Sequence, residues 1–116
     1  MLFRTPQTIY RKQPGHYDHG VWVEGALAAG TIEASVQPAS QGDYDRMRAA
    51  LEGRRIESMI RLYSDDPLEP AGFDGTNLAN GDEVEYAGDR YLVVALSPWQ
   101  SGVISHYRIL AARFPQ

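Results

Sequence analysis

The last third of the chain shows the clearest pattern of hydrophobic and polar positions. Residues 82–87 alternate, with acids on one side and apolar residues on the other, which predicts a strand with one face in water. Residues 105–113 also alternate, with Tyr107, Ile109 and Ala111 on one side and His106, Arg108 and Leu110 on the other. Glycine at position 88, followed by Asp89, indicates a hairpin turn after the first of these segments, because glycine adopts a positive φ without strain.

The segment between them, residues 90–97, is apolar on both faces, with Leu92, Val94 and Leu96 expected on one of them. A strand of this kind is central in a sheet or covered on both sides. Residues 98–102, PWQSG, are expected to end it, and Trp99 is expected to pack against the core. The pattern over 81–114 therefore predicts an antiparallel meander around a buried middle strand.

The first half of the chain contains shorter periodic segments. Strands are predicted at 8–12, 21–24, 31–37 and 56–63. Between them, 13–20 reads as a polar loop and the small-residue segment 25–30 as an exposed, flexible connector. Residues 1–7 are expected to form a loose N-terminal arm, because Pro6 cannot donate a ladder hydrogen bond.

Residues 43–52 interrupt this β pattern. They carry apolar side chains at helical spacing, and Gly53 follows the last of them. Ser40 or Asp43 is expected near the N-cap. A helix of about ten residues is not stable alone in water, so we expect it to plug or flank the sheet.

Together these elements predict a mainly β fold, a small antiparallel β-barrel or sandwich with one short helix and a long loop. The whole chain, 1–116, is long enough for one hydrophobic core, which predicts a single domain. The irregular segment 64–80 is long for a compact domain, and such loops usually have a role. We expect it to be free to contact a neighbouring chain.

Composition narrows the functional classes. The chain has a net charge of −4 and no cysteine, so disulfides and thiolate metal sites are excluded and no general attraction to phosphate backbones is expected. No apolar run approaches the roughly 20 residues of a membrane span, and the N-terminus lacks the apolar core of a signal peptide. The expected location is therefore inside the cell in which the chain is made.

Charge is unevenly distributed. Residues 65–89 contain eight acids and no Lys or Arg, whereas Arg46, Arg48, Arg54 and Arg55 cluster upstream. Such a separation suits association of an acidic patch with a basic one, although solvated loops also produce it.

Candidate chemistry is sparse. His16, Asp18 and His19, with His106 as a third imidazole, have side chains that ligate metals, but a polar loop gives them no fixed geometry, and we expect surface histidines and no metal site. There is no G-x-S-x-G elbow and no phosphate-binding GK[ST] motif. We therefore expect no enzyme activity and no cofactor.

Small barrels that bind single-stranded nucleic acid use exposed aromatic and basic side chains. Tyr10, Arg11, Lys12, Tyr17 and Trp22 offer such a combination. The acidic net charge and the single lysine argue against this interpretation.

The order of the segments is similar to that of a known family. VQPAS is followed by a helix ending in EGRR, a strand ending in LYS, a loop, the hairpin GDEVEYAGDRYLVVALSPW and the strand SHYRIL. This order, over about residues 31–112, resembles the head–tail joining (head-closure or stopper) proteins of tailed-phage necks. Their G-D-x-V/I-x-y-x-G-x-x-Y-x-V hairpin with a following Trp is matched by Gly81, Asp82, Val84, Tyr86, Gly88, Tyr91, Val93 and Trp99. The first 30 residues do not fit the pattern.

The resemblance implies a structural virion protein that forms a homo-oligomeric ring, six- or twelvefold, in the neck between the portal or adaptor and the tail. The ring would retain packaged DNA, which passes through it without specific binding, and the subunit would be in the host cytoplasm during assembly. The candidate inter-subunit contacts are Arg46, Arg48, Arg54, Arg55, Leu68, Phe73 and Leu78. The candidate channel-facing acids are Asp65, Asp66, Glu69 and Asp74, whose charge would repel the DNA backbone and let it slide.

Two alternatives stay open. A tail-completion or tail-terminator protein would share the barrel and the ring but contact the tail tube. A monomeric barrel that binds nucleic acid or a peptide belongs to a different class.

Overall fold

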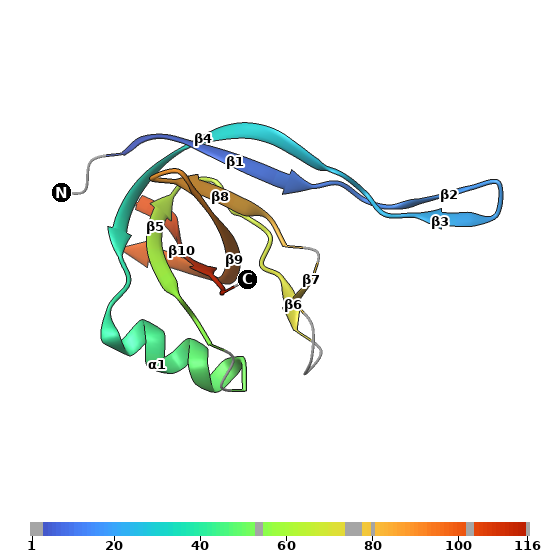
Figure 1. Ribbon diagram of the computed structural model, residues 1–116. Coiled ribbons are helices and arrows are strands. Elements are labelled where there is room, and N and C mark those ends of the chain that lie inside the picture. Colours follow the sequence, from blue (N-terminus) through green and yellow to red (C-terminus); the bar gives the residue numbers. More distant parts are fainter. Residues whose placement is uncertain (1–3, 53–54, 74–77, 80, 102–103, 116) are drawn as a thin grey trace.

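The computed structural model describes residues 4–52, 55–73, 78–79, 81–101 and 104–115. Six antiparallel strands close a barrel in the order β1–β4–β5–β10–β9–β8, and helix α1 (Gln41–Ala50) lies beside one end of it (Figure 1). The barrel strands are β1 (Thr5–Lys12), β4 (Leu27–Pro38), β5 (Ser58–Ser64), β8 (Glu83–Tyr86), β9 (Asp89–Ser101) and β10 (Ile104–Arg113). The predicted small antiparallel β-barrel with a short helix is confirmed.

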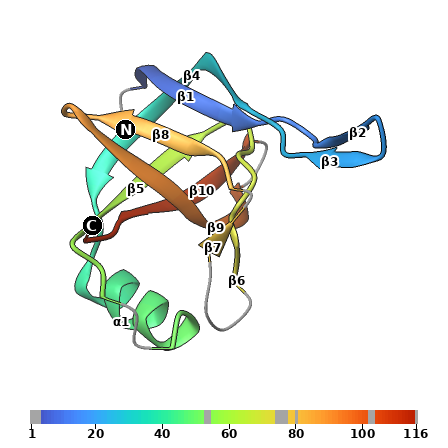
Figure 2. The ribbon, with the colours of Figure 1, turned by 45° about the vertical axis from the view of Figure 1, so that its right-hand side comes forward.

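Two short hairpins lie outside the barrel. Strands β2 (His16–Asp18) and β3 (Val21–Val23) continue the paired strands β1 and β4 and project far from the barrel (Figures 1 and 2). This projection gives the molecule its long axis, with extents of 51 × 30 × 29 Å. Strands β6 (Gly72–Phe73) and β7 (Leu78–Ala79) form the second hairpin, within the predicted long loop.

Buried side chains form two groups. The barrel interior contains Ile9, Ile32, Ala34, Ile60, Leu62, Leu68, Val84, Tyr91, Val93, Ile109 and Ala111. The second group lies between α1 and the outer face of the barrel and contains Met47, Leu51, Met59, Leu110 and Ala112. Strands β5 and β10 are thus buried on both faces, and this packing stabilises a helix too short to form alone.

A β-bulge in β9 changes the predicted side-chain alternation. Leu110 of β10 pairs with Ala95 but Ala111 pairs with Val93, so Val94 is an extra residue. Val94 and Ala95 both pack against the helix group, and Leu96 returns to the barrel interior. The prediction that Leu92, Val94 and Leu96 share one face is therefore wrong, because an inserted residue reverses a period of two.

Three predicted boundaries are also wrong. Strand β1 begins at Thr5 and pairs through Pro6, so the predicted arm 1–7 extends into the barrel. The predicted connector 25–30 lies largely in β4, because Leu27 to Gly30 pair with β1 and small residues accept a strand when a partner supplies the ladder. Strand β9 continues through Pro98 and pairs with β10 as far as Ser101.

The helix and the β8–β9 turn form at their sequence signals with shifted bounds, and α1 covers Gln41–Ala50 where 43–52 was predicted. Ser40 is the N-cap of α1: its Oγ accepts a hydrogen bond from the Asp43 backbone N–H, and the Asp43 carboxylate accepts one from the Ser40 N–H. Ala87 and Gly88 have φ of 53° and 84°, as a type I′ hairpin turn requires. The turn is therefore Ala87-Gly88, one residue earlier than predicted.

Candidate functional site

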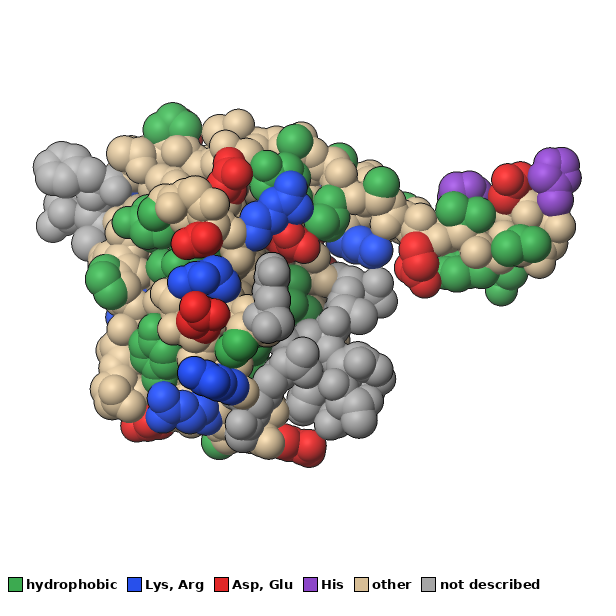
Figure 3. Space-filling view, viewed as in Figure 1, with side chains coloured by type: hydrophobic (Ala, Val, Ile, Leu, Met, Phe, Trp, Pro, Cys, Tyr) green, Lys and Arg blue, Asp and Glu red, His purple; other side chains and the backbone are tan. Residues whose placement is uncertain are grey.

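The projecting hairpin carries the largest exposed hydrophobic side chains among the described residues (Figure 3). Tyr17 is 73% exposed, Val21 65% and Trp22 49%. Tyr17 and Trp22 face each other across β2 and β3 with ring centroids 5.0 Å apart, in an edge-to-face arrangement. Two three-residue strands are marginally stable in water, and exposed aromatic rings on such a hairpin are typical of an interaction element. The hairpin is therefore the candidate functional site.

The hairpin contradicts the predicted polar loop at 13–20, because residues 16–18 form a strand. Its turn is His19-Gly20, with φ of 51° and 82°, the same type I′ geometry as in the barrel. The short run HYD, a two-residue turn ending in Gly, and VWV together form a hairpin signal. Alternation of polar and apolar residues cannot be recognised over three residues. The turn residues between the two short runs were therefore the only signal in the sequence that could have indicated this hairpin.

The base of the hairpin is held by close packing. The ring of Trp22 lies over Gly15, where an added Cβ would be 2.4 Å from a ring carbon, and its Nε1 donates to Glu24 Oε1 at 2.9 Å. A Cβ at Gly25 would lie 1.8 Å from the Gln13 carbonyl oxygen, so the connections β1–β2 and β3–β4 cross closely there. These contacts fix the direction in which the hairpin leaves the barrel.

Replacing Gly15 with Ala is expected to displace the Trp22 ring, because the new methyl group would occupy the position of the ring and approach the Val23 carbonyl. In a Trp99→Phe background, the remaining tryptophan fluorescence should shift to longer wavelength and become more accessible to acrylamide. Gly42→Ala is the control, since its backbone has no positive φ and the nearest atom to its added Cβ is the Ser40 Oγ at 3.8 Å. An unchanged emission spectrum in Gly15→Ala would contradict the packing.

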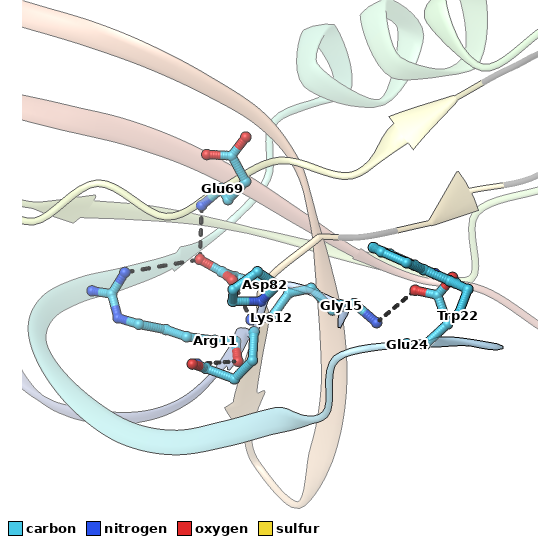
Figure 4. A pocket seen from close by; sticks show the side chains of 9 residues that line it. Arg11, Lys12, Gly15, Trp22, Glu24, Glu69 and Asp82 are labelled. Carbon is cyan, nitrogen blue, oxygen red and sulfur yellow. Dashed lines mark hydrogen bonds and ion pairs between the residues drawn. The ribbon is translucent and has the colours of Figure 1, made fainter. Parts of the chain in front are cut away.

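A buried carboxylate anchors the base of the hairpin to the barrel. Asp82 is 3% exposed and accepts hydrogen bonds from the backbone N–H groups of Lys12 and Glu69, both at 2.8 Å (Figure 4). Its own N–H donates to the Glu69 carbonyl, and its carbonyl accepts from the Val93 N–H. Asp82 thus joins the end of β1, the loop before β6, and β9, an arrangement that the sequence analysis did not predict.

Asp82 and the hairpin base border an open groove of about 560 Å³. Figure 4 shows Arg11, Lys12 and Glu69 near Asp82, with Trp22 and Glu24 farther along. Arg11 Nη1 is 3.9 Å from the Asp82 carboxylate, and Lys12 Nζ donates to the Gly25 carbonyl. The two cations already have partners in their own chain, so the groove is a polar joint at the base of the hairpin.

The described part of the predicted free loop packs on its own barrel. Leu68 is 1% exposed and belongs to the interior, and the Ala71 N–H donates to the Val93 carbonyl. Leu68 is therefore wrong as a candidate inter-subunit contact, because its burial stabilises the fold of the subunit itself. The backbones of Phe73 and Leu78 pair in β6–β7, and their side chains lie outside the description.

The predicted charged contacts have different surroundings. Asp65, Asp66 and Glu69 are exposed, and an ion pair between Asp65 and Arg4 lowers the pKa of Asp65. Arg46, Arg48 and Arg55 are exposed as well, with Arg48 3.8 Å from Asp45 of the same helix. Arg54 and Asp74 lie outside the described residues. The roles given to these residues stay predictions.

The histidines of the sequence analysis are on different elements. His16 and His19 belong to the hairpin, where His19 is 3.5 Å from Asp18, and His106 of β10 packs edge-to-face on Tyr63. In the described part of the chain, no group of three or more His, Cys, Asp or Glu side chains is arranged to hold a metal ion.

The residues weighed as a nucleic-acid face are partly grouped. Tyr17 and Trp22 are on the hairpin, with Arg11 and Lys12 at its base. Tyr10 lies under the guanidinium of Arg90, 3.6 Å from its ring centroid.

Comparison with known proteins gives no family. No family model matches the sequence, and no curated protein is similar to it. None of the described helical segments has the length and apolar character needed to cross a bilayer.

Proposed function

We propose that this chain is a structural subunit of a tailed-phage neck that assembles with copies of itself into a ring between the portal or adaptor and the tail. The observation that carries the proposal is the projecting β2–β3 hairpin, whose aromatic side chains are exposed in the subunit. The resemblance of residues 31–112 to head–tail joining proteins is the reason for proposing a neck protein and not another ring-forming protein.

Two physical features support a ring subunit. A ring built by rotation requires two different patches on each copy, one that reaches out and one that receives. The hairpin extends from a rigid barrel and so provides the first patch (Figure 2). Burying Tyr17 and Trp22 against a neighbour would remove the largest exposed apolar side chains from water.

The exposed acids Asp65, Asp66 and Glu69 suit a subunit beside DNA that it does not bind. In this proposal they face the channel, where their charge repels the phosphate backbone and lets the DNA pass. The ring retains the genome by closing the head and receives the tail at its other face.

Deleting the gene from its phage is expected to leave heads that have lost their packaged DNA and finished tails that do not join them, visible by electron microscopy of lysates. Expression of the chain in trans should restore joined particles. Loss of a tail-terminator protein would instead change tail length, which distinguishes that alternative. Normal infectious particles without this chain would contradict both.

A binding module is favoured by one observation, the proximity of Tyr17 and Trp22 to Arg11 and Lys12. Retention on single-stranded DNA at physiological salt, lost when Tyr17 and Trp22 are replaced with Ser, would support that function.

A further inference from the structure

Several edges of the ribbon formed by β1 with β4 and by β2 with β3 pair with no other described strand, and those of β4 and β2 differ most in character. Strand β5 covers β4 only over Ala34–Pro38, which leaves the edge of β4 from Leu27 to Glu33 free on the side away from β1. Strand β2 pairs with β3 alone, so its other edge is free. The Gln13 N–H donates to the Ala26 carbonyl and connects the two pairs into one ribbon. A contact between a β2 edge and a β4 edge therefore joins two different parts of the surface.

Over residues 27–32 the free edge of β4 lacks the usual protection against pairing, and its one charged residue is Glu33 at the barrel end. Proteins blunt open edges with charged residues, proline or bulges, because unpaired N–H and C=O groups accept another strand. Residues 27–32, LAAGTI, contain neither charge nor proline. Ala28, Ala29 and Gly30 are exposed and leave room beside the backbone. This edge is suited to receive a strand with large side chains.

Strand β2 has the complementary character. All three of its residues are exposed, and Tyr17 at its centre is the most exposed of the large hydrophobic side chains described. An aromatic ring beside glycine or alanine on a neighbouring strand covers the backbone that small residues leave open. Tyr17 therefore fits next to the small residues of β4.

We propose that β2 of one copy of this chain pairs, antiparallel, with the free edge of β4 over Leu27–Glu33 of a second copy. When two ribbons point the same way, β2 runs outward and β4 runs back to the barrel, so a β2 edge beside a β4 edge is antiparallel to it. Because a β2 edge meets a β4 edge, the contact is heterologous, and it forms a ring where its repetition by rotation closes. The inference specifies the contact of the proposed neck ring and rests on that function.

The available area and charge agree with a second copy as the partner. The exposed parts of Tyr17, Val21, Trp22 and Val23 offer on the order of 400 Å², about half of the roughly 800 Å² that each partner buries in a standard interface. The β4 edge and the adjacent barrel surface have to supply the rest. Asp18 of β2 is exposed, and Arg11 lies directly across from Ala28 on the receiving ribbon, which places opposite charges beside the contact. Such charges set the register of a contact more than its affinity.

Site-specific cross-linking tests the pairing directly, because the chain has no cysteine. His16→Cys on β2 and Ala29→Cys on β4 are prepared separately, mixed near millimolar concentration, and treated with a short bis-maleimide. We expect the mixed His16→Cys/Ala29→Cys dimer to exceed either homodimer, and a variant with both cysteines to form a ladder of oligomers. Preferential Ala29→Cys homodimers, which indicate two-fold pairing of β4 edges, or no cross-linked product would overturn the proposal.

Surface variants measure what the contact contributes. Tyr17→Ser removes the central ring and Ala29→Lys places a charge on the edge, and each is expected to weaken self-association at least about tenfold by sedimentation equilibrium. Tyr86→Ser and Ala50→Lys are matched controls on exposed positions elsewhere and should associate as the wild type does. Circular dichroism confirms that every variant is folded. Equal association of the Tyr17→Ser and Tyr86→Ser variants would overturn the role of Tyr17.

The same variants separate this contact from the function. If Tyr17→Ser and Ala29→Lys restore head–tail joining in the deletion phage as fully as the wild-type chain, the contact is wrong and the neck function stands. If the cross-links form as expected but the deletion phage produces normal particles, the contact stands and the neck function is wrong.

Discussion

Replacing Arg61 with Ala should lower the free energy of unfolding by about 3–5 kcal/mol, the usual cost of leaving one charge of a buried pair without its partner. The Asp43 carboxylate is 1% exposed, at the start of α1, and Arg61 of β5 donates to it from Nε at 3.0 Å and from Nη2. Arg61 also donates to the Ser40 Oγ and the Tyr63 hydroxyl. The guanidinium thus joins the helix N-cap to the barrel wall, and the alanine variant loses both links.

The pH dependence of the loss identifies its cause. Burial raises the pKa of Asp43, but the hydrogen bonds from Arg61 and from the Ser40 N–H outweigh it, so its pKa is lowered in the folded protein. A lowered pKa means that the pair stabilises the wild type above the ordinary carboxyl pKa of about 3.9, and that this stability is lost as the pH falls through the lower, folded value. Without Arg61, burial dominates and Asp43 binds a proton more readily. The difference in the free energy of unfolding between the wild type and Arg61→Ala should therefore be largest at pH 7 and become smaller at low pH.

Urea unfolding at pH 7 and at several values below pH 4 measures both effects. Arg48→Ala is the control, since its exposed pair with Asp45 should contribute less than about 1 kcal/mol. A similar loss in both variants, or a loss in Arg61→Ala that does not change with pH, would contradict the assignment of the stability to the Asp43–Arg61 pair.

The fold class was predictable because its strongest signals are local. Acids alternate with apolar residues in β8, both faces of β9 are apolar, and α1 carries its N-cap box and apolar spacing within about a dozen residues. Each of these patterns lies within one element and shows which of its faces is apolar. In the barrel these apolar faces are the ones that pack against the core, so the patterns predict the fold. The bulge at Val94 was not predictable in this way, because it appears only in the register between two strands.

The candidate site depends on contacts between distant segments and was harder to predict. Leu68 was assigned to a free loop because its neighbours are acids, prolines and glycines, yet its side chain fills the interior between strands. The segment 25–30 has weak strand propensity and becomes a strand because β1 lies beside it. In the sequence Asp82 is one of eight acids in 65–89 and has no feature that indicates burial. Its role becomes visible only in the structure, where it accepts hydrogen bonds from the Lys12 and Glu69 backbone N–H groups. Tertiary pairing decided each case.

Replacing Asp82 with Ala is expected to cost roughly 3 kcal/mol, because the buried Lys12 and Glu69 N–H groups would each lose an ionised acceptor. Asp82→Asn should lose less, since its amide oxygen still accepts from one N–H while its NH₂ group faces the other. Urea unfolding gives the free energy, and amide hydrogen exchange should show protection falling first at Lys12 and Glu69. Asp66→Ala, which removes an exposed acid of the same loop, should change neither measurement appreciably.

The effect should extend to the hairpin, although Asp82 is not in the proposed contact. Lys12 is the last residue of β1, and the ribbon that carries β2 and β3 begins there. Releasing it from Asp82 leaves the direction of the hairpin to the packing at Gly15 and Gly25 alone. We therefore expect weaker cross-linking between His16→Cys and Ala29→Cys when Asp82→Asn is added to both partners, under conditions where that variant is fully folded. Full cross-linking with reduced protection at Lys12 would show that the hairpin base is rigid without the carboxylate, and that Asp82 serves only the fold.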